Sequence, residues 1–403
     1  MGTPAAVFIE SNSSGSGADF ILRARELGLL PVFITGSPER YTFLHRSSDI
    51  DLRTCDTSSE VALTAVVDDV AAAMPIKLLT TSSDLYLHTA ALQARRLGLA
   101  GPDPNTIARC RNKARQADAL RSAGVDVPHS ATIRADCDID SAIARVGLPA
   151  VAKPISGTGS IGVTLVETEL DATKTLRSLL QITTDVRGRP APSGALLMSY
   201  IAGDEFSVEI LDRQVIGVTR KHLGHLPHFV EIGHDVPARV SPHLRTKLVD
   251  EAVHAIDILG HARGAAHVEL RANQECITII EVNPRLAGGS IPRLLRYATG
   301  FDPVDGVLRS LLGMPLGAVT GGTNGSIRFI VPKREGPFDL PRSRQSIIDL
   351  FELTEFALYR TLPTEFTRFD DFRDRIGHVI AIDADPTAAA RRAEAAVNFI
   401  CHV

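Results

Sequence analysis

Short apolar runs alternate with amphipathic stretches over the first hundred residues of the chain. The runs at 7–9, 30–34 and 76–80 are typical of buried strands, and the spacing of apolar residues over 18–27 and 86–97 is typical of helices. Strand and helix follow one another through short links, which predicts parallel strands with right-handed crossover connections. We therefore expect the chain to begin with a parallel α/β domain.

Beyond residue 100 the pattern predicts one basic helix over 106–123 and then becomes richer in strands. Two apolar strands at 149–154 and 162–166 flank a Gly- and Ser-rich loop, which indicates a hairpin with a long tip. A long amphipathic helix is expected over 244–260. Further strand-like segments are 195–200, 205–211, 214–219, 267–272, 276–283, 326–331 and 377–383, and a last helix is expected after Asp385-Pro386.

Length and composition exclude several classes of protein. A chain of 403 residues predicts two to three domains, and 44% apolar with 22% charged residues is typical of a globular protein. The 43 Lys and Arg nearly balance the 47 Asp and Glu, so neither nucleic acid nor an acidic membrane is an expected partner. No apolar run is long enough to span a bilayer, and the first residues lack the basic start of a signal peptide. The five scattered Cys form no CxxC pair, which favours a reducing, cytoplasmic location without a zinc site.

The most informative window is a predicted β-ribbon that carries two acidic residues. Glu269 and Glu281 each lie in a strand-like run, twelve positions apart across a turn, and period-two alternation puts Glu281, Asn283 and Arg285 on one strand face. Two carboxylates and an amide oxygen this close predict a hard cation, Mg²⁺ or Mn²⁺. The alternative is a pair of edge carboxylates in salt bridges with Arg271 and Arg285.

A second window has the character of a phosphate-binding loop. Lys153 closes an apolar strand and precedes Ser156, Gly157, Gly159 and Ser160. Glycines allow backbone N–H groups to turn toward a polyphosphate, and the lysine adds a positive charge. The lysine precedes the glycines, so this is not a Walker loop; a plain Gly-rich hairpin tip is the alternative.

Two further segments carry weaker signals. Lys113, on the predicted basic helix, is a candidate second phosphate contact or an ordinary solvated lysine. The Gly- and Ser-rich loop at 11–17 lacks the full GxGxxG spacing, so it gives little support to the hypothesis of an NAD site there. We expect this loop to border a substrate pocket instead.

Taken together and in order, these windows resemble the ATP-grasp superfamily of carboxylate–amine ligases. The ordered set is Lys113, the loop from Lys153, the segment from Met198 to Glu205, Glu269, and Glu281-Val282-Asn283-Pro284-Arg285. The resemblance implies a Rossmann-like parallel α/β domain over 1–105, followed by an ATP-grasp fold of two α+β subdomains over 106–190 and 191–403.

The resemblance also implies roles for individual residues. Lys113, Lys153 and the Gly-rich loop would hold the phosphates of ATP, and the loop would close as a lid. Met198, Tyr200 and Ile201 would form the hinge that reads adenine, and Glu205 would contact the ribose. Glu269, Glu281 and Asn283 would hold Mg²⁺, and Arg285 would meet the substrate carboxylate and then the acyl phosphate. Ser199 stands where members often carry Glu.

A finer match, at 229–238 and 286–292, is similar to the L-amino-acid ligase branch, which forms dipeptides or related amides. It implies that Glu231 and His234 line an amino-acid pocket, although His234 could equally be a loop residue bonded to backbone. The expected partners are a small-molecule carboxylate and amine, and a homodimer is possible on the same grounds. The alternatives are a biotin-carboxylase-like or purine-pathway enzyme of the same superfamily, a non-catalytic ATP-binding regulator, and an NAD-dependent oxidoreductase.

Overall fold

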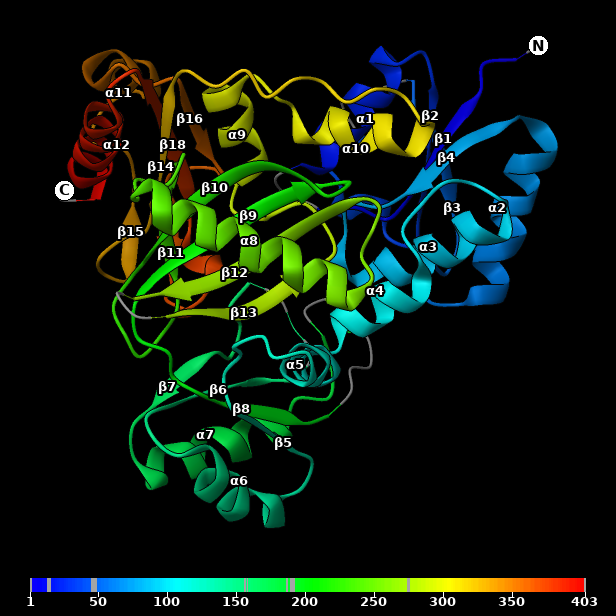
Figure 1. Cartoon of the computed structure of the whole chain (residues 1–403). Helices are drawn as coiled ribbons and strands as arrows, with labels where there is room; N and C mark the ends of the chain where they lie inside the picture. The colour runs from blue at the N-terminus through cyan, green and yellow to red at the C-terminus, as the bar shows by residue number, and fades with distance from the viewer. Residues whose placement is uncertain are drawn as a thin grey trace.

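The structure of the chain is a computed structural model, and it describes residues 2–12, 16–44, 49–155, 157, 159–185, 188, 193–273 and 276–401. The chain forms three units, each built around its own sheet (Figure 1). The N-terminal sheet is parallel, and the four-stranded and eight-stranded sheets that follow are antiparallel. The mixed α/β and α+β class predicted from the sequence is confirmed.

The N-terminal unit has four parallel strands in the order β3-β2-β1-β4. Its strands are β1 (Ala5–Ile9), β2 (Leu30–Thr35), β3 (Asp51–Thr54) and β4 (Ile76–Thr80). Its helices are α1 (Gly17–Glu26), α2 (Glu60–Ala73) and α3 (Leu87–Arg96), with the short turns η1 (Pro38–Arg40) and η3 (Asp84–Tyr86). Every residue of β1 is buried, because this inner strand has neighbours on both edges and helices against its side chains.

The helix expected over 106–123 is wrong as one element, because Asn112 divides it. α4 (Pro104–Arg111) and α5 (Lys113–Ser122) meet at Asn112, which has an extended backbone and accepts a hydrogen bond from the backbone N–H of Arg115 at 3.0 Å. Asparagine is a strong N-cap residue, so it starts a second helix here. Lys113 thereby becomes the first residue of α5.

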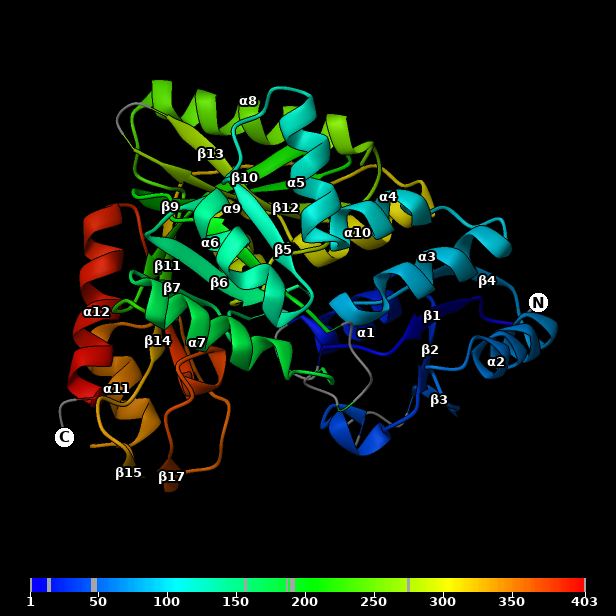
Figure 2. The same cartoon turned by 90° about the horizontal axis from the view of Figure 1, so that it is seen from below.

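The central unit has a four-stranded antiparallel sheet in the order β5-β8-β6-β7, covered on its outer face by two helices (Figure 2). The elements are β5 (Ser130–Ile133), η4 (Asp136–Asp138), α6 (Ile139–Val146), β6 (Ala150–Pro154), β7 (Thr164–Val166), α7 (Glu169–Leu180) and β8 (Ala195–Ser199). β6 and β7 pair as the predicted hairpin. The domain limits stay a prediction; the pairing of β8 with β5 and β6 favours a second boundary after Ser199 rather than at 190.

The third unit holds an eight-stranded sheet in the order β13-β12-β9-β10-β11-β14-β18-β16. Its strands are β9 (Asp204–Leu211), β10 (Gln214–Leu223), β11 (Glu231–Val236), β12 (Ala265–Ala272), β13 (Ile277–Asn283), β14 (Asn324–Ile330), β16 (Glu355–Leu358) and β18 (Gly377–Asp383). β15 (Gly336–Phe338) and β17 (Thr364–Phe366) form a separate pair. The helical elements are α8 (Pro242–Leu259), α9 (Ile291–Thr299), α10 (Pro303–Leu312), α11 (Arg344–Phe351), η5 (Phe372–Asp374) and α12 (Pro386–Cys401).

The two faces of the large sheet differ in chemistry near β9, β12 and β13. On these strands the alternate residues Phe206, Val208, Val268 and Leu270 are buried in the core that α8 covers. The residues between them point to the opposite face, because side chains alternate along a strand. That opposite face is polar and carries Glu205, Ser207, Glu209, His267, Glu269 and Arg271.

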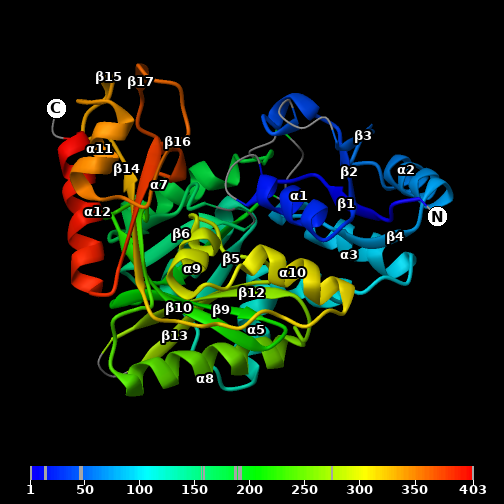
Figure 3. The ribbon, with the colours of Figure 1, turned by 90° about the horizontal axis from the view of Figure 1, so that it is seen from above.

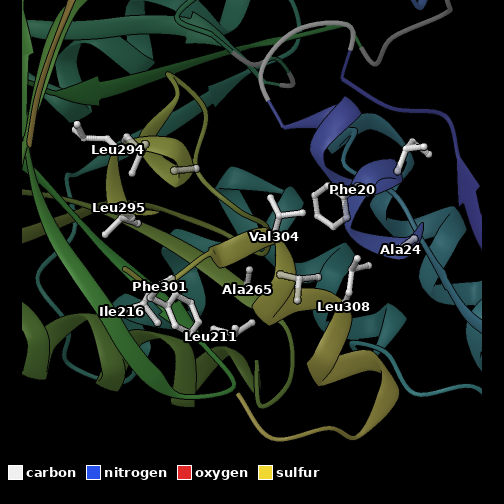
Figure 4. Packing of buried hydrophobic residues seen from close by; sticks show 14 of the residues in the cluster. Phe20, Ala24, Leu211, Ile216, Ala265, Leu294, Leu295, Phe301, Val304 and Leu308 are labelled. Atoms are coloured by element: carbon white, nitrogen blue, oxygen red, sulfur yellow. The ribbon is translucent and has the colours of Figure 1, made fainter. Parts of the chain in front are cut away.

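The N-terminal unit packs against the third unit through an apolar core. Figure 4 shows Phe20 and Ala24 of α1 facing Val304 and Leu308 of α10, and Figure 3 shows the two helices side by side. Phe20 is 4% exposed and Leu308 is fully buried. Burial of such side chains stabilises this junction by about 1.5–3 kcal/mol each.

Among the helices that the structure describes, none has the length and apolarity required to cross a membrane.

Candidate functional site

A cavity of about 690 Å³ is lined by residues of all three units. Fourteen of the sixteen predicted site residues lie on its wall: Lys113, Lys153, Gly157, Gly159, Ser160, Met198, Tyr200, Ile201, Glu205, Glu231, Glu269, Glu281, Asn283 and Arg285. Ser156 lies outside the described residues. His234 is fully buried and does not line the cavity. The structure therefore brings together residues that span more than 170 positions of sequence.

The strand register brings charged and polar side chains next to one another on the polar face of the large sheet. Glu269 lies opposite Glu281 across the β12–β13 pair, and His267 lies opposite Asn283. On the other side of β12, His267 faces Glu209 of β9. Directly opposed residues in an antiparallel pair have Cβ atoms about 5 Å apart, so these polar groups must interact.

The two predicted phosphate-contacting lysines both approach Glu281. Lys113 Nζ lies 3.2 Å from Glu281 Oε1 and donates to the carbonyl of Gly157 at 3.3 Å. Lys153 Nζ lies 4.0 Å from Glu281 Oε2. Burial lowers the pKa of Lys153, and the nearby Glu281 opposes that shift. A polyphosphate would offer both lysines stronger partners than this one carboxylate.

Lys221, which the sequence analysis did not single out, joins three of the cavity carboxylates. Its Nζ lies 2.8 Å from Glu205, 2.9 Å from Glu231 and 3.3 Å from Glu269, and its side chain is 3% exposed. Burial disfavours its charged form, but the carboxylates outweigh burial and hold its pKa well above the ordinary value. The ammonium group therefore stays charged and links the predicted ribose, substrate and metal positions.

His267 is a second cavity residue that the sequence analysis did not assign. Its Nδ1 lies 2.9 Å from Glu209 Oε1 and its Nε2 lies 2.9 Å from Glu269 Oε1. Burial lowers the pKa of the imidazole, but the two carboxylates outweigh burial and raise it to about 9. Burial raises the pKa of Glu269, but Lys221 and the hydrogen bond from His267 outweigh burial and hold it below its ordinary value.

The predicted hinge is fixed by Arg271. Its Nη1 donates to the carbonyl of Ile201 at 2.8 Å, and its Nη2 lies 3.0 Å from Glu205. The guanidinium group also lies over the rings of Tyr200 and Phe229. Glu205 is thus held by two cations, Arg271 and Lys221, and its predicted contact with a ribose stays a prediction.

Arg285 lies where the third unit meets the N-terminal unit. Its Nη1 donates to the carbonyl of Leu286 at 2.9 Å, and its Nε lies 3.5 Å from Asp84 of η3. The Nε–H is buried and makes no hydrogen bond to any described residue. The guanidinium group therefore has donor capacity left for an anionic group in the cavity.

Glu231 lies at another part of the cavity wall, and His234 lies buried behind it. Glu231 is bound by Lys221 and by Arg375, whose Nη2 lies 2.9 Å away, and these cations outweigh burial and hold its pKa well below the ordinary value. His234 Nε2 lies 3.6 Å from Glu231, and burial lowers the pKa of its imidazole to about 3. A Cβ on Gly289 would lie 2.5 Å from His234 Nε2, so only glycine fits there, at φ +58°.

A further part of the cavity wall comes from the C-terminal third of the chain and is rich in arginine. Arg293 pairs with Glu355 at 2.8 Å and Asp19 at 3.3 Å, and Arg373 pairs with Asp371. Arg360 donates to the carbonyl of Arg373 and has no carboxylate partner among the described residues. This part of the wall can therefore accept one anionic group without breaking an ion pair.

The residues present fit a hard divalent ion. Glu269, Glu281 and Asn283 supply carboxylate and amide oxygens from adjacent strands, which are the ligands that Mg²⁺ or Mn²⁺ prefers. In the part of the chain that the structure describes, no group of three or more His, Cys, Asp or Glu side chains is arranged to hold a metal. Such an ion would depend on Asn283 and on phosphate oxygens to complete its ligand shell.

Comparison with known proteins agrees with this arrangement. Residues 146–293 match the model of the ATP-grasp domain. The chain is 28% identical over 401 residues to the uncharacterised protein y4rH of Sinorhizobium fredii, covering 98% of this chain and 82% of that protein. It is 27% identical over 296 residues to carnosine synthase 1 of Mus musculus, covering 66% of this chain and 34% of the synthase. It is 24% identical over 243 residues to alanine–anticapsin ligase of Bacillus subtilis, covering 56% of this chain and 51% of the ligase.

Solved structures show the same fold. L-amino acid ligase from Bacillus licheniformis superposes with a TM-score of 0.80 at 20% identity, covering 95% of this chain and 94% of the ligase. N5-carboxyaminoimidazole synthase from Aspergillus clavatus superposes with a TM-score of 0.75 at 14% identity over the whole of both chains. The resemblance predicted from the ordered motifs is confirmed: this chain contains an ATP-grasp domain and has the fold of the ATP-grasp ligases.

Proposed function

We propose that the chain is an ATP-dependent ligase that joins the carboxylate of an amino acid, or of a related acid, to an amine and releases ADP and phosphate. The observation that carries the proposal is the single cavity in which two lysines, two opposed strand carboxylates and Arg285 meet. The relatives named carnosine synthase and alanine–anticapsin ligase support an amino acid as a substrate.

The first step activates the acid. A carboxylate oxygen attacks the γ-phosphorus of ATP, the bond to the β,γ-bridging oxygen breaks, and an acyl phosphate and ADP form. Lys113 and Lys153 would leave Glu281 and bind the phosphate oxygens. A divalent ion held by Glu269, Glu281 and Asn283 would neutralise charge on the transferred phosphoryl group. Gly157, Gly159 and Ser160 would close over the phosphates as a lid that excludes water.

The second step forms the C–N bond. The neutral amine attacks the acyl carbon, the tetrahedral intermediate carries an oxyanion, and phosphate leaves as the carbonyl re-forms. Arg285, which lines the cavity at the junction of the units, would donate to that oxyanion. Glu231 is the first candidate to receive the amine proton, because it is an ionised carboxylate on the cavity wall. His234 is the weaker candidate, because it does not line the cavity and burial lowers the pKa of its imidazole to about 3.

A screen for ADP release tests the proposal. The enzyme is supplied with Mg²⁺, ATP and pairs of amino acids, and ADP formation should depend on both members of a productive pair. In a parallel reaction, hydroxylamine should replace the amine and trap the activated acid as a hydroxamate. If no acid that supports ADP release gives a hydroxamate, the result argues against the acyl-phosphate route.

The same screen separates the alternatives. ADP release that requires bicarbonate or a ribosylamine would indicate the carboxylase or purine-pathway type of enzyme. ATP binding without ADP release in any mixture would indicate a non-catalytic regulator.

A further inference from the structure

Glu269 is held by donors that come from the protein itself. His267 Nε2 and Lys221 Nζ both lie on its Oε1 atom, at 2.9 Å and 3.3 Å. No described residue donates to Oε2. Since Glu269 lines the cavity, the carboxylate presents one engaged oxygen to the sheet and keeps the other available.

The contacts of Glu269 extend through His267 to buried residues of the neighbouring strand β9. His267 also lies 2.9 Å and 3.1 Å from the two oxygens of Glu209, and Ser207 donates to Glu209 Oε1 at 2.7 Å. The side chains of Glu209 and His267 are each 4% exposed. A buried carboxylate–imidazole pair contributes little net stability, because desolvation opposes its attraction. Stability alone therefore does not account for the pair beside the cavity.

Glu281 is held in the opposite way. Among the described residues it forms ion pairs with Lys113 and Lys153, the two lysines expected to move to the phosphates of ATP. Glu281 thus exchanges partners when ATP binds, whereas Glu269 keeps His267. The two carboxylates differ in how firmly the protein orients them before a metal arrives.

We propose that Glu209 and His267 form a positioning pair that orients Glu269 for the divalent ion and so determines the affinity of the site for that ion. The proposal rests on the proposed function, because the ion is the one that would accompany ATP. In this role His267 acts through its contact with Glu269. Groups that orient metal ligands typically change metal affinity by 10–100-fold when they are removed.

Direct metal binding tests this pair. Free Mn²⁺ is titrated by electron paramagnetic resonance in the presence of the full chain and ADP. We expect His267→Phe to weaken Mn²⁺ binding about 10–100-fold. His267→Gln keeps an amide N–H near the position of Nε2, so it should bind within a few-fold of the wild type. Glu209→Gln should fall between the two, and it serves as the reporter if His267→Phe does not fold.

His261 supplies a matched control. It is also buried, at 3% exposed, and lies 3.0 Å from the carbonyl of Ala265, but it does not line the cavity. His261→Phe should change thermal stability without changing Mn²⁺ affinity. In ADP-release assays, raising the Mg²⁺ concentration should restore the rate of His267→Phe.

The outcomes are distinguishable. If the wild type fails to bind Mn²⁺ together with ADP, the metal site of the proposed function is wrong, and this inference is lost with it. If the wild type binds and folded His267→Phe binds equally well, only the role of the Glu209–His267 pair is wrong.

Discussion

The two ends of the cavity are built differently. At the end proposed for ATP and metal, the carboxylates and Lys153 stand on paired strands, and register fixes each one against its neighbours, as with Glu269 opposite Glu281. At the end proposed for the acid and amine, they come from loops and strand ends of distant segments. Arg285 follows β13, Gly289 precedes α9, Arg360 follows β16, and Asp84 comes from the N-terminal unit.

This difference indicates that the two ends of the cavity have different functions. Phosphoryl transfer depends on charges held in fixed positions, and a sheet supplies that rigidity. Substrate choice depends on the shape and charge of the wall, and loops can vary without disturbing the sheet beneath. Substitutions at the strand end should therefore affect every substrate pair, whereas those at the loop end should affect one substrate.

The largest effect is expected at the strand end. Glu281→Gln removes a charge from the proposed metal site and leaves the two lysines without their carboxylate, so ATP turnover should fall roughly 10³-fold or more with every substrate pair. Circular dichroism should show an unchanged fold. Glu167→Gln, at an exposed position of the central unit, is the control. A variant that still cleaves ATP at the wild-type rate would remove the metal assignment.

A smaller and selective effect is expected at the loop end. Arg360→Gln removes the arginine that has no carboxylate partner among the described residues. If it binds an anionic group of one substrate, the KM of that substrate should rise about tenfold or more, because charge-assisted hydrogen bonds contribute about 1.5–3 kcal/mol. The kcat and the KM of ATP should stay within about twofold. Arg334→Gln, exposed and off the cavity wall, is the matched control; equal KM values in both variants would contradict the division drawn here.

The smallest effect concerns stability at β11, beside the end proposed for the acid and amine. Burial lowers the pKa of His234 to about 3, whereas a histidine in the unfolded chain has a pKa of about 6.5. Between these values only the unfolded state binds the proton, so stability falls as the pH decreases through this window. The Tm of the wild type should therefore drop more steeply from pH 6.5 to 5 than the Tm of His234→Asn. Parallel Tm curves would contradict a neutral buried imidazole, and His129→Asn controls for loss of an exposed histidine.

The strand elements of the fold were predictable where the pattern was regular. β4 and β18 have the limits that their apolar runs predicted, and the ribbon of β12 and β13 pairs as expected. The helix over 106–123 was wrong because its apolar spacing continues through Asn112, while the side chain of Asn112 caps a new helix. Periodicity does not detect a cap inside a continuous pattern.

The candidate site was predictable in part. Glu269, Glu281 and Asn283 were identified because they lie on one local ribbon with period-two spacing. The strands that carry Lys221, His267 and Glu209 also alternate between apolar and polar residues. The contacts that distinguish these three residues come from neighbouring strands, which the local pattern does not reveal. Nothing in the local pattern of β10 indicates that Lys221 faces three carboxylates.

The sequence by itself determined the element types, the ordered motifs and the family, because alternation, glycine placement and short spacings are local properties. Only the tertiary structure decided which strands lie side by side, and hence that Lys221 joins three carboxylates and that Glu209 reaches Glu269 through His267. It also decided that Asp84 of the first unit lies beside Arg285 of the third. Strand pairing within the large sheet and packing between units bring together residues that are far apart in the chain, and no short window of sequence contains that information.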